Sequence, residues 1–238
     1  MNIQLEKKFI EEYDASQYKK MSVAVDILIF TVQDKHLEVL LVKREEFPFK
    51  DCLALPGTFV GEKESLDDAV KRCLQEEIGI TDMYTEQLYT WGEVERDPRL
   101  RVLSVSYVAL VNKSKCNPKA GKRVTDVCWM EVSMEHMDAI RNQMAFDHAK
   151  IIQCGLERLR GKIEYAPIVF HMLEDEFTLP QLQSIYESIL GKKLYKANFR
   201  KKIMDMVVET GNIQSGEANR PSKYYCWKDK IQEKEKML

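Results

Sequence analysis

Residues 55–80, LPGTFVGEKESLDDAVKRCLQEEIGI, decide how the first part of this 238-residue chain is organised. The second half of the stretch predicts a helix, because apolar residues recur at helical spacing on one face and a glycine follows as a stop signal. Cys73, Glu76 and Glu77 stand three and four positions apart, so they face roughly the same way on that helix. Magnesium prefers carboxylate oxygen to a soft thiol, so Cys73 would be a poor magnesium ligand beside these two glutamates.

The stretch resembles the signature of the Nudix family, G-x5-E-x7-R-E-U-x-E-E-x-G-U, where U is apolar. Thr58 replaces the first glycine, and Cys73 replaces the first glutamate of the R-E pair. The matching residues are Glu64, Arg72, Leu74, Glu76, Glu77, Gly79 and Ile80. The resemblance implies that carboxylates at these positions gather the divalent metal for pyrophosphate hydrolysis. Because Cys73 continues the apolar stripe of its helix, we expect it to pack inside and leave hydrolysis weak or absent.

A hydrolase remains the alternative function. Intact Glu64, Glu76 and Glu77 are compatible with a magnesium-dependent enzyme acting on ADP-ribose or a related nucleoside diphosphate derivative. Glu93 and Glu95 are candidates for supplying the missing carboxylate. On this sequence, any metal would be held weakly by Glu76 and Glu77, and no catalytic residue is assigned.

Strand-like segments surround the helix. They are the β-branched runs at residues 22–32 and 37–44 and the segments 85–96, 102–111 and 124–132. Residues 53–60 contain a Pro-Gly pair that marks a turn, and an amphipathic helix at 149–161 closes this region. Strands mixed with helices indicate an α/β or α+β sandwich. The resemblance makes this a Nudix α/β/α sandwich over residues 21–160, an effector-binding domain that follows an N-terminal arm at residues 1–20.

Four arginines are candidates for binding the effector in that domain. The segment GEVERDPRLRVLSVSY resembles one common in ADP-ribose-type Nudix proteins and their regulatory relatives. A guanidinium is a fork-shaped donor suited to phosphate or ribose oxygens. We therefore assign effector binding to Arg44, Arg96, Arg99 and Arg101, with surface ion pairs as the competing interpretation. His148 could lie near the pocket or the domain joint, but a single histidine carries no mechanistic weight.

After Gly161 the pattern changes to that of a winged helix-turn-helix domain, at residues 161–238. A short helix is expected at 165–173, followed by a clear helix at 178–190 with a capping box of Thr178 and Gln181. Further along, we expect a helix at 196–208, a polar turn at 210–222 and a strand at 223–227. The expected inward residues of the 196–208 helix are Phe199, Ile203 and Met206.

Positive charge gathers in this C-terminal part. Residues 191–223 hold eight Lys and Arg against three Asp and Glu, although the whole chain has a net charge of −2. Early residues of a recognition helix reach base edges, so Asn198 and Arg200 are candidate base readers. Phosphate contacts are expected from Lys192 and Lys193 as well as from the helix. The DNA-binding assignment comprises Lys196, Asn198, Arg200, Lys201, Lys202, Arg220 and Lys223.

Over residues 11–227 the chain resembles the Nudix-related, NrtR-like transcriptional regulators. Beside the altered box, the similarity rests on AFDH, FTLPQLQSIYESILGKKLYKANFRKKI and NRPSKYY. It implies a homodimeric repressor whose effector is ADP-ribose or, in another branch, a sugar such as arabinose. The expected partners are then double-stranded operator DNA and the effector. No cofactor is required for this function, and magnesium would be needed only for residual hydrolysis.

The rest of the composition excludes several classes of protein. No apolar run approaches the ~18 residues of a membrane span, and no signal-peptide pattern is present, so a cytoplasmic protein without membrane contact is expected. Six cysteines without a CxxC pair indicate neither a zinc site nor a disulfide framework. The effector's identity, the operator and the direction of the ligand's effect stay open.

Overall fold

The computed structural model describes residues 3–79, 83–116, 118, 124–135, 137–213 and 221–229. Its large sheet is built from β1 (Ser22–Gln33), β2 (His36–Arg44), β3 (Leu53–Ala54), β4 (Gly57–Phe59), β5 (Tyr84–Trp91), β6 (Val102–Leu110) and β7 (Val124–Glu131). The strand order is β3-β2-β1-β6-β5, with β4 paired to β1 and β7 paired to β2. β1 and β6 are parallel, and the other strand pairs described in this sheet are antiparallel.

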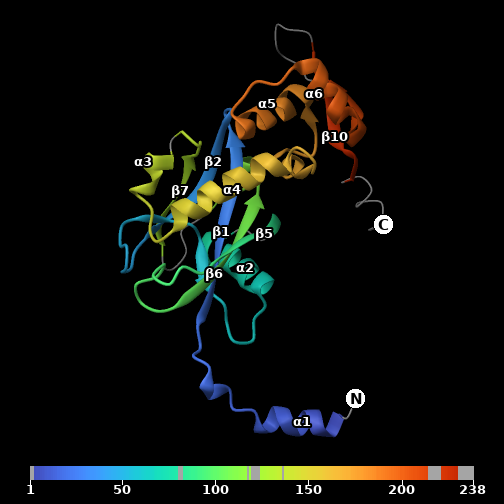
Figure 1. Ribbon diagram of the computed structural model, residues 1–238. Helices are drawn as coiled ribbons and strands as arrows, with labels where there is room; N and C mark the ends of the chain where they lie inside the picture. Colours follow the sequence, from blue (N-terminus) through green and yellow to red (C-terminus); the bar gives the residue numbers. More distant parts are fainter. Residues whose placement is uncertain are drawn as a thin grey trace.

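The central strand β1 supplies side chains to both faces of this sheet. Leu28 and Phe30 belong to one buried apolar cluster, whereas Ile27 and Ile29 belong to another. This division follows from the period of two in a β-strand. The first cluster is covered by α4 (His148–Lys162) and the second by α2 (Leu66–Cys73), so helices cover opposite faces of the sheet (Figure 1).

Helix α2 continues into a π-helical turn, Leu74–Ile78, and ends at Gly79 with a φ of 75°. Ser65 caps its N-terminus by accepting from the backbone N–H of Asp68. The expected helix is therefore present, although its last turn is wider than an α-helix. The remaining described helices of this half are α1 (Ile3–Glu12) and α3 (Met137–Arg141), with 3-10 turns at Ala15–Gln17 and Lys113–Lys115.

The C-terminal half is a compact helical unit with a small sheet. Its elements are a 3-10 helix at Ile168–Met172, β8 (Phe177–Thr178), α5 (Leu179–Leu190), α6 (Lys196–Ile203), a 3-10 turn at Met204–Met206, β9 (Val207–Ile213) and β10 (Lys223–Trp227). The sheet order is β8-β10-β9. The expected capping box of Thr178 and Gln181 starts α5, and Gly191 ends it with a φ of 67°.

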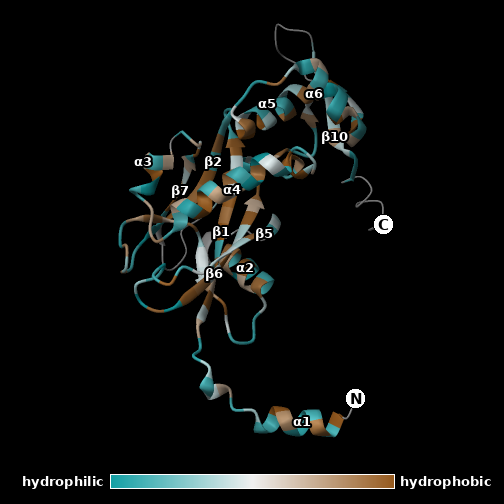
Figure 2. Cartoon of the chain, viewed as in Figure 1, coloured by the Kyte–Doolittle hydropathy of each residue, from teal (hydrophilic) through white to brown (hydrophobic). Residues whose placement is uncertain are grey.

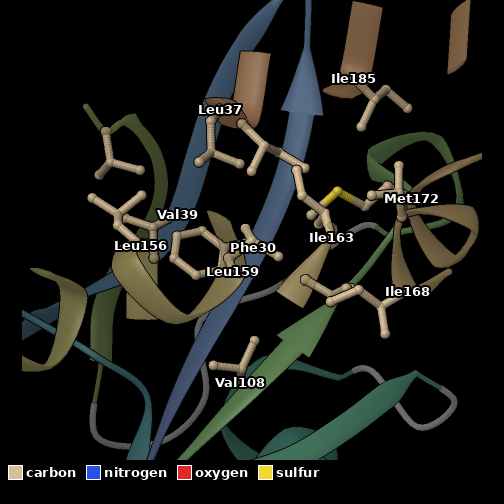
Figure 3. Close-up of a cluster of buried hydrophobic side chains, with 14 of the residues drawn as sticks. Phe30, Leu37, Val39, Val108, Leu156, Leu159, Ile163, Ile168, Met172 and Ile185 are labelled. Atoms are coloured by element: carbon tan, nitrogen blue, oxygen red, sulfur yellow. The ribbon is translucent and has the colours of Figure 1, made fainter. Parts of the chain in front are cut away.

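One apolar cluster joins the two halves. It contains Phe30 of β1 and Leu156 of α4 together with Leu182 of α5 and Phe199 of α6. Figure 3 shows side chains from β1, β2, α4, α5 and the 168–172 turn within this cluster. In Figure 2 the strands of the large sheet are coloured mainly as apolar, in agreement with their burial. The C-terminal unit is thus packed onto the sheet rather than tethered by a linker.

Four sequence-based expectations about element bounds are wrong. The strand expected at 85–96 ends at Trp91, where its pairing with β6 ends at Ser104. The helix expected at 165–173 is a 3-10 helix over residues 168–172 that follows Pro167. The helix expected to reach residue 208 ends at Ile203, so Met206 lies in a 3-10 turn. Residues 207–213, including part of the expected polar turn, pair with β10 as a strand.

The N-terminal arm stands apart from this body. All described residues before β1 are exposed, and Figure 1 shows α1 extending away from the sheet. Figure 2 shows that α1 carries both apolar and hydrophilic residues. Within the described ranges, no helix is both long enough and apolar enough to span a bilayer.

Gly155 permits the close approach of α4 to β1. A Cβ atom at this position would lie 2.0 Å from Leu28 Cδ2 and 3.5 Å from Phe30 Cε2. Both neighbouring side chains have an exposed fraction of 0%, so neither can move into solvent. Any larger residue must therefore displace the buried Leu28 side chain or move the helix away from the strand.

We predict that Gly155→Ala destabilises the protein through this collision. The matched control is Gly161→Ala in the same helix, where an added Cβ meets nothing within 4 Å. Both substitutions replace a helical glycine by alanine, and the gain in helix propensity is greater at Gly155, in the middle of α4, than at Gly161 in its last turn. A lower stability of Gly155→Ala therefore reports packing. We expect Gly155→Ala to be less stable than the control by ~1–3 kcal/mol in urea denaturation. Equal midpoints for the two variants would contradict this account of the α4 contact.

Candidate functional site

A cavity of about 140 Å³ opens where β2, β4, the loop after β5 and the start of α4 meet. Its lining includes Arg44, Thr58, Arg96, Arg99, Phe146 and His148. The fold therefore brings three of the four expected effector-binding arginines together at this cavity. Arg101 does not line this cavity; its Nη1 donates to the carbonyl oxygen of Glu93 at 2.7 Å.

Arg96 is buried in the wall and is held by two carboxylates. Its Nε and Nη2 donate to the two oxygens of Asp147 at 3.0 and 2.7 Å, and Nη2 also reaches Asp26 Oδ2 at 3.2 Å. Ser104 donates its hydroxyl to the same Asp26 oxygen at 2.5 Å. Since burying an unpaired charge is costly, these partners make the burial of Arg96 possible. The group thereby connects β1, the loop after β5 and the start of α4.

His148, the first residue of α4, completes this wall. Its Nδ1 accepts a hydrogen bond from the backbone N–H of Leu55 at 2.9 Å, which leaves the proton of a neutral imidazole on Nε2. Nε2 lies 3.5 Å from Asp26 Oδ1. Burial lowers the pKa of His148, and the carboxylates of Asp26 and Asp147 oppose that shift. His148 is therefore a neutral part of the cavity wall.

The rim of the cavity combines cations with an aromatic ring. Arg44 Cζ lies 4.9 Å and Arg99 Cζ 5.8 Å from the ring centre of Phe146. Phe146 has a φ of 52°, a left-handed conformation that is rare for a bulky residue and is often found at functional sites. Arg99 also forms two hydrogen bonds to the carboxylate of Asp97, at 3.0 and 2.8 Å. Arg44 donates to the carbonyl oxygen of Pro48 at 3.0 Å.

Arg72 of the box is a structural clamp. Its Nε and Nη2 bind both carboxylate oxygens of Glu64, at 2.7 and 2.8 Å, while Nη1 binds Thr58 Oγ1 at 3.2 Å. Nη2 also donates to the carbonyl oxygen of Phe59. Arg72, together with the N–H of Gly61, lowers the pKa of Glu64 to about 2. The altered Thr58 thus helps fix α2 to β4.

The described residues do not fit a magnesium site. Cys73 has an exposed fraction of 0% and packs in the apolar cluster under α2, as expected. Glu64 is occupied by Arg72, and Glu76 is an exposed residue 3.7 Å from Arg72 Nη1. Glu93 and Glu95 are exposed and do not line the cavity. The side chain of Glu77 lies outside the described residues, and no group of three potential metal ligands is found among those that are described.

A second candidate surface lies on α6, which follows α5 after a short turn. Phe199 and Ile203 are buried, and the Phe199 ring packs edge-on against Tyr186 of α5. Lys196, Asn198, Arg200 and Lys201 are exposed, and within the described ranges their side chains form no hydrogen bond or ion pair. Cations without internal partners are available to a polyanion.

Other expected DNA contacts have partners inside the protein. Lys202 donates to the carbonyl oxygen of Glu164 at 2.9 Å. Lys193 binds Glu187, and Lys223 binds Glu209 across β9 and β10. Lys192 is exposed, whereas Arg220 lies outside the described residues. An exposed pair of this kind is worth little, so Lys193 and Lys223 could exchange their partner for a phosphate.

Sequence patterns did not single out several residues of the cavity wall. Asp26 sits inside an apolar strand pattern, and Asp147 and Phe146 precede a helix in the AFDH segment. A lone carboxylate within a β-branched run was a usable signal, because such a group needs a buried partner. Its pairing with Arg96, seventy residues away in the chain, is a tertiary contact that no local pattern specifies.

Comparison with known families gives two matches in separate segments. Residues 20–153 match the family described as NUDIX domain, which is more than half of the chain. Residues 169–227 match the family described as NrtR DNA-binding winged helix domain. The expected combination of a Nudix sandwich and a winged helix is thereby confirmed.

Individual proteins support the same division. The ADPR responsive transcriptional repressor NtrR of Acinetobacter baylyi is 34% identical over 228 residues, 94% of this chain and 89% of that protein. An ADP-ribose pyrophosphatase of Methanocaldococcus jannaschii is 33% identical over 150 residues, 62% of this chain and 82% of that protein. The second similarity is therefore confined to a smaller part of the chain.

Shewanella oneidensis NrtR provides two similar crystal structures. Its complex with a 27mer DNA has a TM-score of 0.75 and 35% identity, covering 87% of this chain and 93% of that one. Its NUDIX domain complexed with ADP ribose has a TM-score of 0.57 and 36% identity, covering 65% of this chain and 98% of that one.

We predict that His148 makes stability fall as the pH drops below about 6.5, the ordinary pKa of histidine. The unfolded chain takes up a proton there, whereas the folded imidazole, with its lowered pKa, takes it up only at lower pH. Between the two pKa values, protonation of His148 lowers the free energy of unfolding by up to ~1.4 kcal/mol per pH unit. In His148→Asn, the amide oxygen can still accept from Leu55 without titrating. Urea midpoints at pH 7.5 and 5.5 should therefore differ less in this variant; an equal difference in both proteins would refute the prediction.

Proposed function

Because this chain belongs to the NrtR-like family of Nudix-related transcriptional regulators, we propose that it is a repressor that binds operator DNA and senses ADP-ribose. The observation that carries the proposal is the exposed face of α6. Its cations Lys196, Arg200 and Lys201 have no side-chain partner among the described residues, and α6 belongs to a domain that shares one apolar core with the Nudix sandwich. The winged helix supplies DNA binding, and the Nudix domain supplies the ligand site.

On DNA, α6 acts as the recognition helix in the major groove. Asn198 reads adenine and Arg200 reads guanine, because each side chain can form two hydrogen bonds with the edge of that base. Lys196 and Lys201, joined by Lys192, Lys193 and Lys202, contact phosphates and give affinity without sequence choice. Lys223 and Arg220 contact the backbone or the minor groove from the wing.

In the cavity, Arg44 and Arg99 bind the pyrophosphate or ribose oxygens of ADP-ribose beside the Phe146 ring. Arg96 is held by Asp26 and Asp147, so it contributes by positioning the wall unless the ligand displaces a carboxylate. Arg101 could contact the ligand only after a movement of the loop of residues 92–101, because it now binds the carbonyl oxygen of Glu93. No metal is required for this binding, and magnesium would matter only for residual hydrolysis.

A sugar is the second candidate effector. The cavity volume of about 140 Å³ is smaller than the ~300–1,000 Å³ usual for ligand pockets. Glu45, Glu46 and Asp97 also line it, and carboxylates are good acceptors for sugar hydroxyls. ADP-ribose would have to extend past the rim, whereas a pentose could be enclosed.

Helix α4 provides the physical connection between ligand and DNA sites. Its first residue is His148 in the cavity wall, and Arg160 near its other end donates from Nε to the carbonyl oxygen of Ile189 in α5 at 2.9 Å. A small displacement of the α4 N-terminus therefore changes the placement of α5 and α6. In a homodimer on a partly palindromic operator, this alters the fit of two winged helices to their half-sites. A coupling of ~1–3 kcal/mol is typical for such regulation. The site of action is the bacterial cytoplasm, where the operator lies.

The proposal is tested by titrating the purified chain with the DNA upstream of its own gene neighbourhood, at near-physiological salt and with nonspecific competitor. ADP-ribose or arabinose is then added. Specific binding that one ligand changes supports a regulator and identifies its branch. Absence of specific binding, together with magnesium-dependent turnover of ADP-ribose, would support the hydrolase alternative instead.

We predict that Arg200→Ala weakens operator binding by ~1–3 kcal/mol and leaves ligand binding unchanged, because a base contact is lost far from the cavity. Arg141→Ala is the matched control, an exposed arginine on α3 whose partner Asp138 is at 3.8 Å. Fluorescence anisotropy measures DNA affinity, and calorimetry measures ligand affinity. An equal loss of both affinities in Arg200→Ala would overturn the assigned roles.

A further inference from the structure

Tyr195 immediately precedes α6 and is unusually exposed. Its exposed fraction of 82% is the largest among the described large apolar side chains. The backbone carbonyl of Tyr195 accepts from the N–H of Phe199 at 2.9 Å, so the residue starts the helix. Its side chain forms no cap hydrogen bond. An aromatic ring in water at the leading end of a recognition helix is available for contact with another molecule.

The backbone that carries this ring is held firmly. The N–H of Leu194 donates to Glu187 Oε1 at 2.9 Å, and the carbonyl oxygen of Leu194 accepts from Gln183 Nε2 at 3.1 Å. Both partners belong to α5, which packs in the common core. Gly191 adopts a φ of 67° where the turn leaves α5. Tyr195 therefore extends from a preorganised turn rather than a loose loop.

Around Tyr195 the surface forms a shallow hollow. Leu194, Tyr195 and Ala197 supply its apolar part, and Lys196 and Arg200 supply its charged part. The two cations can bind phosphate or base oxygens, but such oxygens are not suitable partners for the apolar part of the hollow. The apolar group that the major groove offers is the 5-methyl group of thymine, and small or aromatic side chains are suitable contacts for it.

We propose that Tyr195 and Ala197 form a thymine-reading contact at the start of α6. The contact rests on the proposed function, since it requires α6 to lie in the major groove. It adds an apolar base contact to the hydrogen-bonding contacts of Asn198 and Arg200. In each half-site, one thymine is recognised by its methyl group rather than by its oxygen.

The test uses the full chain and an operator fragment located by footprinting. Each thymine in turn is replaced by deoxyuridine, which removes only the 5-methyl group. We expect one position per half-site to weaken wild-type binding about fourfold, the change that corresponds to burying one methyl group. Tyr195→Ala should bind the thymine operator at least fourfold more weakly and should lose its sensitivity to deoxyuridine at that position.

Two variants complete the design. Tyr195→Phe keeps the ring and should keep the sensitivity to deoxyuridine. Tyr18→Ala removes a 61% exposed tyrosine from the N-terminal arm, remote from α6, and should behave as wild type. Thermal denaturation checks that Tyr195→Ala is folded, as expected for an exposed side chain.

The outcomes separate this contact from the proposed function. If wild type binds its operator specifically but no deoxyuridine weakens it, the thymine contact is wrong and the regulator stands. The same holds if Tyr195→Ala keeps both wild-type affinity and wild-type sensitivity. If the full chain binds no DNA specifically, the proposed function and this contact are both wrong.

Discussion

The packing of α4 against β1 is the contact on which the rest of the structure depends. At Gly155 the helix approaches Leu28 so closely that a single added carbon would collide with it. The same helix begins in the cavity wall and ends beside α5. Core atoms move little because protein interiors are densely packed. In the proposed regulator, α4 would therefore carry a displacement from the cavity wall to α5.

The distribution of charge partners separates two kinds of arginine in this chain. Arg72 and Arg96 are tied to carboxylates and hold elements together: Arg72 joins α2 to β4, and Arg96 joins β1 to α4. Arg200 on α6 has no partner in the described chain and is available to an external anion. Arg44 and Arg99 stand between these extremes, because each has internal acceptors but also borders the cavity. In this chain, positive charge alone does not mark an arginine as a candidate for ligand binding. The deciding feature is whether its guanidinium already has a partner inside the protein.

Local sequence signals predicted much of this architecture. The β-branched runs located β1, β2 and β6, and the capping box at Thr178 located α5 because these patterns act over a few residues. The bounds of β5 and α6 were less predictable, since strand pairing across the sheet decides where they end. The altered box correctly predicted that Cys73 would be buried. The wall formed by Asp26, Arg96 and Asp147 was not predicted, because its members meet only when three distant segments fold together.

The most direct test of the coupling through α4 is hydrogen–deuterium exchange on the intact chain, with and without a saturating amount of whichever of ADP-ribose or arabinose alters DNA binding. Exchange reports the free energy of local opening along each helix. Our account predicts that the ligand changes exchange in α4 from its first turn to its last, and also in α5. A change confined to the loops of the cavity, with α4 and α5 unaffected while DNA binding still responds, would contradict it.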